Sequence, residues 1–162
     1  MLKNLKEKGV LNEFFLYLCT ENQNGKIMLK KILAITGKSG LYKLVSHNNN
    51  IVIVESLEDG KRFPTYPRDK VVSLNDISMF TESDDIALRD VLKMVFEMEK
   101  GEVASVDPKA DGSVLREYFA KVLPNFDRDR VHNGDIKKLI QWYNILVKSG
   151  NTNFEEEEEK KS

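Results

Sequence analysis

The sequence is poor in cysteine, histidine and tryptophan. Cys19 is the only cysteine among 162 residues, and there are only two histidines and one tryptophan. A single thiol excludes an internal disulfide, and one thiol with two histidines excludes a thiol-based metal site. The scarcity of cysteine fits a reducing, cytoplasmic setting. No cofactor is expected.

The chain also lacks a long apolar run. A membrane-spanning helix needs about 18 consecutive apolar residues, and no run here approaches that length. The segment "FFLYLC", residues 14–19, is preceded by Glu13 and is not followed by a small-residue cleavage site. We therefore expect a soluble protein with no membrane partner.

A phosphate-binding loop is suggested by "ILAITGKSG" but is incomplete. That loop needs a first glycine five residues before the Gly-Lys-Ser, and the position is occupied by Ile32. The loop must also open a helix, whereas the following "GLYKLV" has strand character. We interpret Gly37 and Gly40 as parts of a turn whose backbone angles other residues avoid.

Short β-branched and apolar runs predict a β module between residues 41 and 80. "LYKLVS" and "IVIVES" flank "HNNN", which is typical of a hairpin, and Asp59 with Gly60 supplies another turn. The segment containing Pro64 should be an edge strand or carry a bulge, because proline cannot donate to a sheet ladder. With "VVSL" and "ISMF" the pattern gives five short strands, which favours a small barrel or sandwich. "KKILAIT" is open between helix and strand.

After residue 80 the apolar period changes from two to 3.6, which predicts three helices. The first should start at Ser83 or Asp84 and stop near Gly101. The second should run from about Ser113 to Pro124, and the third from about residue 135 to a cap at residue 150. No helix alternates with the strands, so a parallel α/β sheet is not expected.

Two terminal segments stand apart from these modules. Residues 1–27 contain an amphipathic stretch that is either a helix docked on the protein or an extension that is not native, with Met28 as the true start. Residues 151–162 carry five adjacent glutamates and should be disordered. The expected organisation is an extension (1–27), a β domain (28–81), a helical domain (82–150) and an acidic tail.

Charge is unevenly distributed, although the net charge is only −1. Residues 26–70 hold nine Lys or Arg against four Asp or Glu, whereas residues 71–119 hold five against eleven. A basic β module could bind a partner or single-stranded nucleic acid through phosphate contacts and base stacking. It could equally dock on the acidic helix beside it. The candidate ligand-binding residues are Tyr42, Lys43, Lys61, Arg62, Tyr66 and Arg68.

Two further features of the helical half have functional interpretations. Arg128 and Arg130 in "NFDRDRVHNGD" could grip a carboxylate or phosphate, but a turn in which aspartates pair with these arginines is favoured. Trp142 could anchor a partner, but more often such a residue fills the core between modules. His47 and His132 lack the neighbours of a catalytic triad.

The segments "MLKKILAITGKSGLYKLVS", "DGKRFPTYPRDKVVSL" and "DRDRVHNGDIKKLIQWYN" resemble an uncharacterised bacterial family of domains of unknown function. The resemblance covers about Met28 to Gly150. It implies an N-terminal SH3-like β module and a C-terminal helical module, and it supplies no activity, cofactor or site residue. Members of that family begin near the position of Met28, so residues 1–27 depart from the pattern.

Together these features predict an α+β protein in which a small SH3-like β-barrel is followed by a three-helix module. No set of acid, base and nucleophile stands out, so we do not expect an enzyme. The leading hypothesis is a cytoplasmic adaptor that recognises a protein or peptide partner through its barrel. The alternative is binding of RNA or DNA by the basic face of the barrel. The sequence leaves the oligomeric state open.

Overall fold

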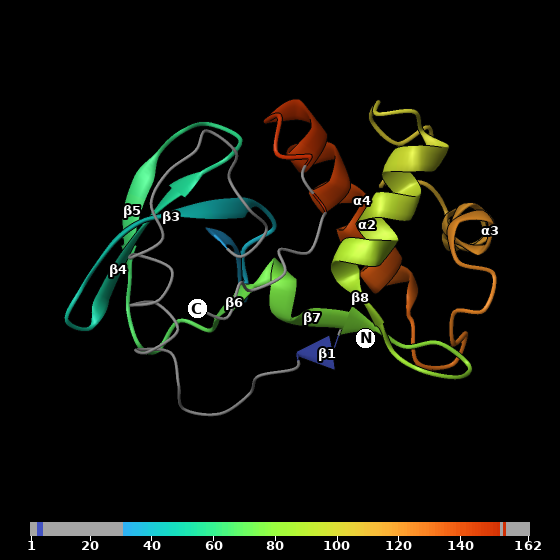
Figure 1. The fold of residues 1–162 in the computed structure, drawn as a ribbon, viewed down its shortest axis with the longest axis horizontal. Helices are drawn as coiled ribbons and strands as arrows, with labels where there is room; N and C mark the ends of the chain where they lie inside the picture. Colours follow the sequence, from blue (N-terminus) through green and yellow to red (C-terminus); the bar gives the residue numbers. More distant parts are fainter. Residues whose placement is uncertain (1–2, 5–30, 153, 155–162) are drawn as a thin grey trace, which may run out of the picture.

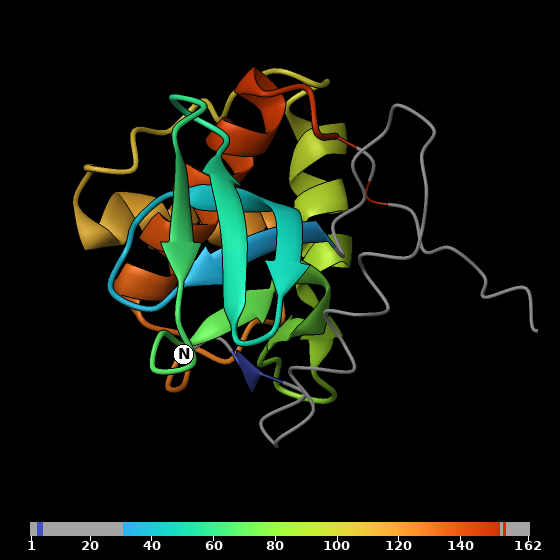
Figure 2. The same cartoon turned by 90° about the vertical axis from the view of Figure 1, so that its left-hand side faces the viewer.

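A five-stranded antiparallel sheet lies beside three helices in the computed structural model, which describes residues 3–4, 31–152 and 154 (Figure 1). The chain is therefore an α+β protein, as predicted. Seen from the sheet side, the strands lie in front and the helices behind, so that the helices cover one face of the sheet (Figure 2). No helix in the described ranges is long and apolar enough to cross a membrane.

The five-stranded sheet has the order β5-β4-β3-β2-β6, in which four strands follow one another and the fifth returns to pair with the first. β5 and β6 form its edges, and no pairing between them is present in the described part of the chain. The edge position of Pro64 on β5 confirms that prediction. The strands are β2 (Ile32–Ile35), β3 (Leu41–Asn48), β4 (Ile51–Ser56), β5 (Arg62–Thr65) and β6 (Val71–Ser73).

The turn after β2 explains the Gly-Lys-Ser segment. Gly37 has φ +87°, a left-handed conformation that glycine adopts without strain, and strands lie on both sides of the turn. The interpretation as a turn is confirmed for Gly37. Gly40 has no positive φ, so its predicted unusual backbone angle is wrong; a Cβ there would lie 2.9 Å from Glu58 Oε2, the end of a flexible side chain.

A second, three-stranded sheet differs from the predicted arrangement. "ISMF" forms β7 (Ile77–Met79) after a short 3₁₀ helix η2 (Leu74–Asp76), but β7 pairs with β1 (Lys3–Asn4) and β8 (Ile86–Ala87). Its expected place in the larger sheet is taken by β2. A period of two identifies a strand but does not reveal which sheet it joins.

Helix α2 runs from Leu88 to Met98, and its predicted start at Ser83 or Asp84 is wrong. Ala87 is the N-cap because β8 pairs with β7 immediately before the helix. This strand pairing outweighs the local capping preference. The other helices, α3 (Gly112–Val122) and α4 (Asn133–Lys148), agree with the predictions to within two residues.

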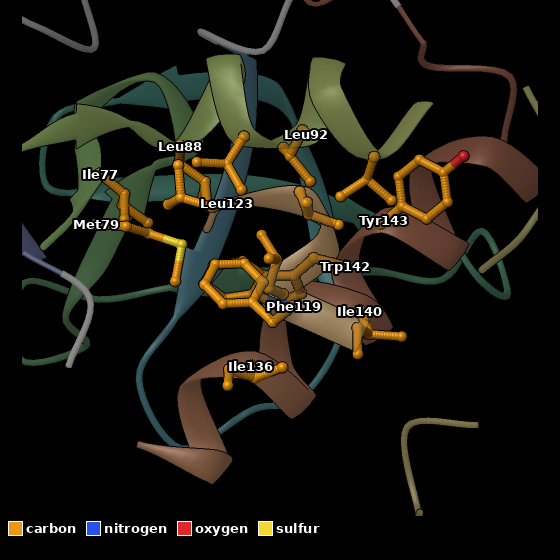
Figure 3. Packing of buried hydrophobic residues seen from close by; sticks show 14 of the residues in the cluster. Ile77, Met79, Leu88, Leu92, Phe119, Leu123, Ile136, Ile140, Trp142 and Tyr143 are labelled. Atoms are coloured by element: carbon orange, nitrogen blue, oxygen red, sulfur yellow. The ribbon is translucent and has the colours of Figure 1, made fainter. Parts of the chain in front are cut away.

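One hydrophobic core joins the sheet to the helices. Ile32 and Leu41 of the sheet are buried in the same cluster as Phe119 of α3 and Tyr143 of α4 (Figure 3). Trp142 is 3% exposed within this cluster. Its core interpretation is thus confirmed, and it does not present a surface anchor.

The opposite face of the sheet has a small core of its own. It consists of Leu33, Ile35, Tyr42, Val52 and Val54, all buried. Strand alternation places these side chains away from Ile32 and Leu41. On β4 only Val52 and Val54 are buried, whereas Ile51 on the other face is exposed, so the apolar run "IVIVES" is buried on one face only.

Packing extends beyond α4. Asn151 is buried, and the buried Phe154 ring lies 5.6 Å from the Phe96 ring of α2, centre to centre. The start of the acidic segment is thus part of the packed structure. The amphipathic stretch expected within residues 1–27 and the glutamates after Phe154 lie outside the described residues, apart from β1.

Candidate functional site

Two predicted binding residues meet on the sheet surface. Lys43 of β3 and Arg62 of β5 both pair with Glu55 of the intervening strand, with Nζ–Oε1 2.8 Å and Nε–Oε2 2.6 Å. The hydrogen bonds from Lys43 and then Arg62 hold the pKa of the Glu55 carboxyl below its ordinary value. One carboxylate therefore offsets part of the positive charge that the sequence predicts here.

Tyr42 lies on the other face of the sheet from Lys43. It is 8% exposed, and its ring meets the Phe63 ring edge-on, with centres 5.1 Å apart and planes at 84°. Burial, and then the charges of Glu58 and Asp59, raise the pKa of the Tyr42 hydroxyl. Tyr42 and the Lys43–Arg62 pair therefore do not form one surface.

The remaining predicted residues of the β module lie at opposite ends of β5. Lys61 pairs with Asp59 at 3.3 Å in the β4–β5 turn. Tyr66 is 43% exposed in the β5–β6 turn, with the Arg68 guanidinium 5.5 Å from its ring centre. The six candidates are thus divided among separate places, and only Lys43 and Arg62 share a direct partner.

The arginines of the α3–α4 loop are largely used within that loop. Arg130 Nε lies 2.7 Å from Asp127 Oδ2, and its guanidinium stacks 4.3 Å from the centre of the Phe80 ring. Arg128 lies 4.8 Å from the Phe126 ring centre. This geometry agrees with the turn interpretation for Asp127 and Arg130. Both arginines are nevertheless exposed, and their role as a secondary patch stays a prediction.

Another cation–aromatic contact involves residues that were not among the predicted binding residues. The Lys38 ammonium lies 3.9 Å from the centre of the Phe63 ring, on a turn whose Gly40 adjoins both Tyr42 and Glu58. The glycines of this turn resemble part of a phosphate-binding loop. For that reason the sequence presents Lys38 only as a phosphate-binding residue and not as a cation beside an aromatic ring. Strand alternation places Tyr42 of β3 and Phe63 of β5 on the same face of the sheet, on either side of β4.

A groove of about 530 Å³ separates the end of the sheet from α4. Its lining combines a carboxylate, an ammonium group, two amides and an apolar wall. The α4 residues of this lining recur every three or four positions and so share one helix face. A helical pattern in the sequence could therefore have identified these positions on α4. The lining residues are Ser39, Leu57, Glu58, Pro108, Gln141, Asn144, Ile145 and Lys148.

No metal site accompanies this groove in residues 31–152. The described residues hold no group of three or more His, Cys, Asp or Glu side chains able to bind a metal ion. His132 instead lies beside Asp135, whose carboxylate accepts a hydrogen bond of 3.0 Å from the His132 backbone at the start of α4. That contact satisfies a backbone donor at the helix end.

Comparisons with known proteins divide the chain into two matched segments. Residues 29–74 match a domain of unknown function (DUF5606), and residues 77–146 match another (DUF6852). The chain is also similar to a protein from Bacteroides vulgatus whose solution NMR structure was solved by a structural genomics consortium. The two are 56% identical with a TM-score of 0.66, and the match covers 78% of this chain and 91% of the other. No curated protein matches the chain.

Proposed function

The chain belongs to a bacterial family of proteins built from these two domains of unknown function, and we propose that it is a non-enzymatic cytoplasmic adaptor. Its groove between the sheet and α4 binds an extended peptide segment of a protein partner. The observation that carries this proposal is the groove itself, because its lining comes from both halves of the molecule.

The chemistry of the groove suits a peptide. Gln141 supplies both a donor and an acceptor for main-chain amides. Asn144 Oδ1 already accepts a 2.8 Å hydrogen bond from the Ala104 backbone, which fixes the side chain and leaves its NH₂ group to donate. Leu57, Pro108 and Ile145 supply apolar contacts. A volume of about 530 Å³ is in the range of ordinary ligand sites.

The sheet supports the same proposal by analogy. Its four consecutive strands and a fifth that returns to the first have the strand order of an open SH3-like barrel, which is the fold we propose for residues 28–81. SH3-like barrels host many binding functions. The β2–β3 turn with Ser39 and the β4–β5 turn with Glu58 lie at the same end of this sheet, so both reach the groove.

The nucleic-acid alternative receives less support. Lys43 and Arg62 share Glu55, and Lys61 pairs with Asp59, so these cations do not form a continuous positive stripe. A nucleic-acid site needs unpaired cations that follow the phosphate backbone. Tyr66 with Arg68 is the one pair of predicted residues that is exposed and carries both an aromatic ring and a cation.

A peptide-display selection against the full chain tests the proposal. A selected peptide should shift the NMR signals of Ser39, Leu57 and Gln141. Gln141→Ala should weaken its binding about tenfold, the effect of one lost hydrogen bond. Glu117→Ala, at an exposed position of α3, should leave affinity unchanged.

The proposal fails if no displayed peptide binds or if the shifts lie elsewhere. In particular, shifts confined to Tyr66 and Arg68 on addition of a short single-stranded oligonucleotide, with affinity falling steeply as salt rises, would establish the nucleic-acid alternative instead.

A further inference from the structure

Tyr42 and Phe63 form an aromatic corner on the face of the sheet that points away from the helices. The rings come from β3 and β5, on either side of β4, and meet nearly at right angles. Phe63 is half-buried, and its ring face carries the Lys38 ammonium at 3.9 Å. The negative face of an aromatic ring attracts a cation at this distance. The corner thus already holds one ammonium group, supplied by the chain itself.

Carboxylates add to the attraction for a cation. A Cβ placed on Gly40 would lie 2.9 Å from Glu58 Oε2 and 3.4 Å from Tyr42 Oη, so both oxygens adjoin the same α-carbon. Glu58 forms no ion pair with any cation of the described residues. The neighbouring Asp59 pairs only with the highly exposed Lys61. Glu58 is therefore a negative charge available to a cation that enters the corner.

Lys38 is a weakly held occupant. It is exposed, it lies on a turn next to Gly37, and Phe63 is the one partner of its ammonium group in the part of the chain that the structure describes. A cation–π contact at an exposed position changes a binding constant by only about two- to fivefold. A second ammonium group with additional contacts can therefore displace it.

We propose that the corner of Tyr42, Phe63 and Glu58 receives a lysine side chain of the protein partner, whose ammonium replaces that of Lys38. The inference rests on the proposed function, because the bound peptide supplies the lysine. Ser39 lines the groove and Lys38 covers the corner, so adjacent residues of one turn face the two sites. A peptide that extends past this turn can occupy both.

An NMR titration with N-acetyl-lysine amide tests the corner without the partner. In the Lys38→Ala chain, this probe should shift the ring signals of Tyr42 and Phe63, with an affinity about two- to fivefold above that of the unmodified chain. N-acetyl-norleucine amide, which has a similar length but no charge, should shift neither ring. Equal shifts from the two probes would overturn the proposal.

Two further variants distinguish a specific cation site from nonspecific binding of the probe. Phe63→Leu in the Lys38→Ala chain should abolish the shifts, because the ring face is removed while the apolar volume is largely kept. If that variant does not fold, Glu58→Gln on the exposed turn should weaken lysine binding at least about twofold. Unchanged affinity in the Glu58→Gln chain would count against the site.

The two proposals can fail separately. If the selected peptides bind the groove, contain no lysine and cause no shifts at Phe63, the proposed lysine site is refuted and the proposed adaptor function is retained. If the lysine probe shifts the ring signals of Tyr42 and Phe63 but no peptide binds the groove, the proposed function is refuted and the cation site is retained.

Discussion

The sheet and the helical half use their cations in different ways. In the helical half, Arg116 of α3 donates to Asn133 Oδ1 at 2.6 Å and to the backbone carbonyls of Val131 at 3.1 Å and Arg128 at 3.3 Å. In the sheet, the charged groups of Lys43 and Arg62 both pair with one carboxylate, that of Glu55, and with no other acid among the described residues. The first arrangement fixes the loop before α4, whereas the second joins three strands that backbone hydrogen bonds already hold.

This difference teaches where charge can be changed without loss of the fold. A cation that satisfies backbone carbonyls cannot be removed without leaving those acceptors unpaired. The two groups of a surface ion pair are well solvated when they are apart, so forming the pair adds little to the stability of the fold. The surface charges of the sheet can therefore be changed at little cost to the fold, whereas the guanidinium of Arg116 cannot.

The largest effect should follow from Arg116→Met, which keeps most of the aliphatic stem and removes the guanidinium. Loss of three charged hydrogen bonds should lower the free energy of unfolding by about 2–3 kcal/mol. Urea denaturation measures it. Arg62→Met is the matched change in the sheet and should have a much smaller effect. Equal losses in the two variants would contradict the distinction between the two halves.

A smaller effect is expected from Gly112→Ala, which disturbs the same loop indirectly. A Cβ at Gly112 would lie 2.1 Å from Asn133 Nδ2 and 2.8 Å from its Cγ, so Asn133 must move away from Arg116. Such overpacking costs about 1–3 kcal/mol, and the lower half of that range applies because one of three bonds is lost. Thermal unfolding measures the loss.

Gly134 provides the control for this substitution. It lies in α4 without a positive φ, and a Cβ added there would meet no atom of the described residues within 4 Å. Gly134→Ala should therefore raise stability by up to about 1 kcal/mol through helix propensity. A loss of stability in both variants would show that these glycines are needed for a reason other than the approach of Asn133.

Much of the fold could be predicted because it depends on local chemistry. The ends of α3 and α4 follow from Pro124 and Gly150, and the edge strand follows from Pro64. The start of α2 could not be found this way, because the pairing of β8 with β7 displaces the N-cap from Ser83 or Asp84 to Ala87. The pairing of two short strands is not specified by a capping pattern, even when the strands are close in sequence.

The candidate site was harder to predict for the same reason. Glu55 pairs with both Lys43 and Arg62 and offsets part of their charge through cross-strand register, which the sequence does not specify. Strand alternation alone, however, already places Tyr42 and Lys43 on opposite faces. The alternation of Tyr42 and Lys43 was therefore visible in the sequence, and it indicated that these two side chains do not belong to one binding surface. The groove combines four separate stretches of chain, and only folding brings them together.

Tyr118→Phe should have an effect of about 1 kcal/mol that depends on pH. Tyr118 Oη donates to Glu99 Oε1 at 2.6 Å, and Ser105 donates to the same oxygen from its backbone at 3.1 Å and its hydroxyl at 2.9 Å. Burial opposes ionisation of Glu99, but these hydrogen bonds prevail and hold the pKa of its carboxyl below the ordinary value. They anchor the loop that follows α2.

The sign of the pH dependence follows from this lowered pKa. Glu99 contributes stability above its unfolded-state pKa, and the contribution is lost as pH falls through its folded-state pKa. The difference between the original chain and Tyr118→Phe should thus be full near about pH 7 and shrink toward about pH 3. Denaturation curves at several pH values measure it, and a constant difference would exclude Glu99 as the cause.

The smallest effect on stability is expected from Glu55→Gln, which removes the carboxylate between Lys43 and Arg62. The backbone pairing of β3, β4 and β5 does not depend on this charge, so the denaturation midpoint should hardly move. The surface should instead become more positive, and retention on a heparin column should increase. Asp107→Asn, which removes one exposed negative charge from the α2–α3 loop, controls for net charge. If Glu55→Gln unfolds the chain as readily as Arg116→Met, the sheet's surface charges are structural after all, and they are not free to serve a partner.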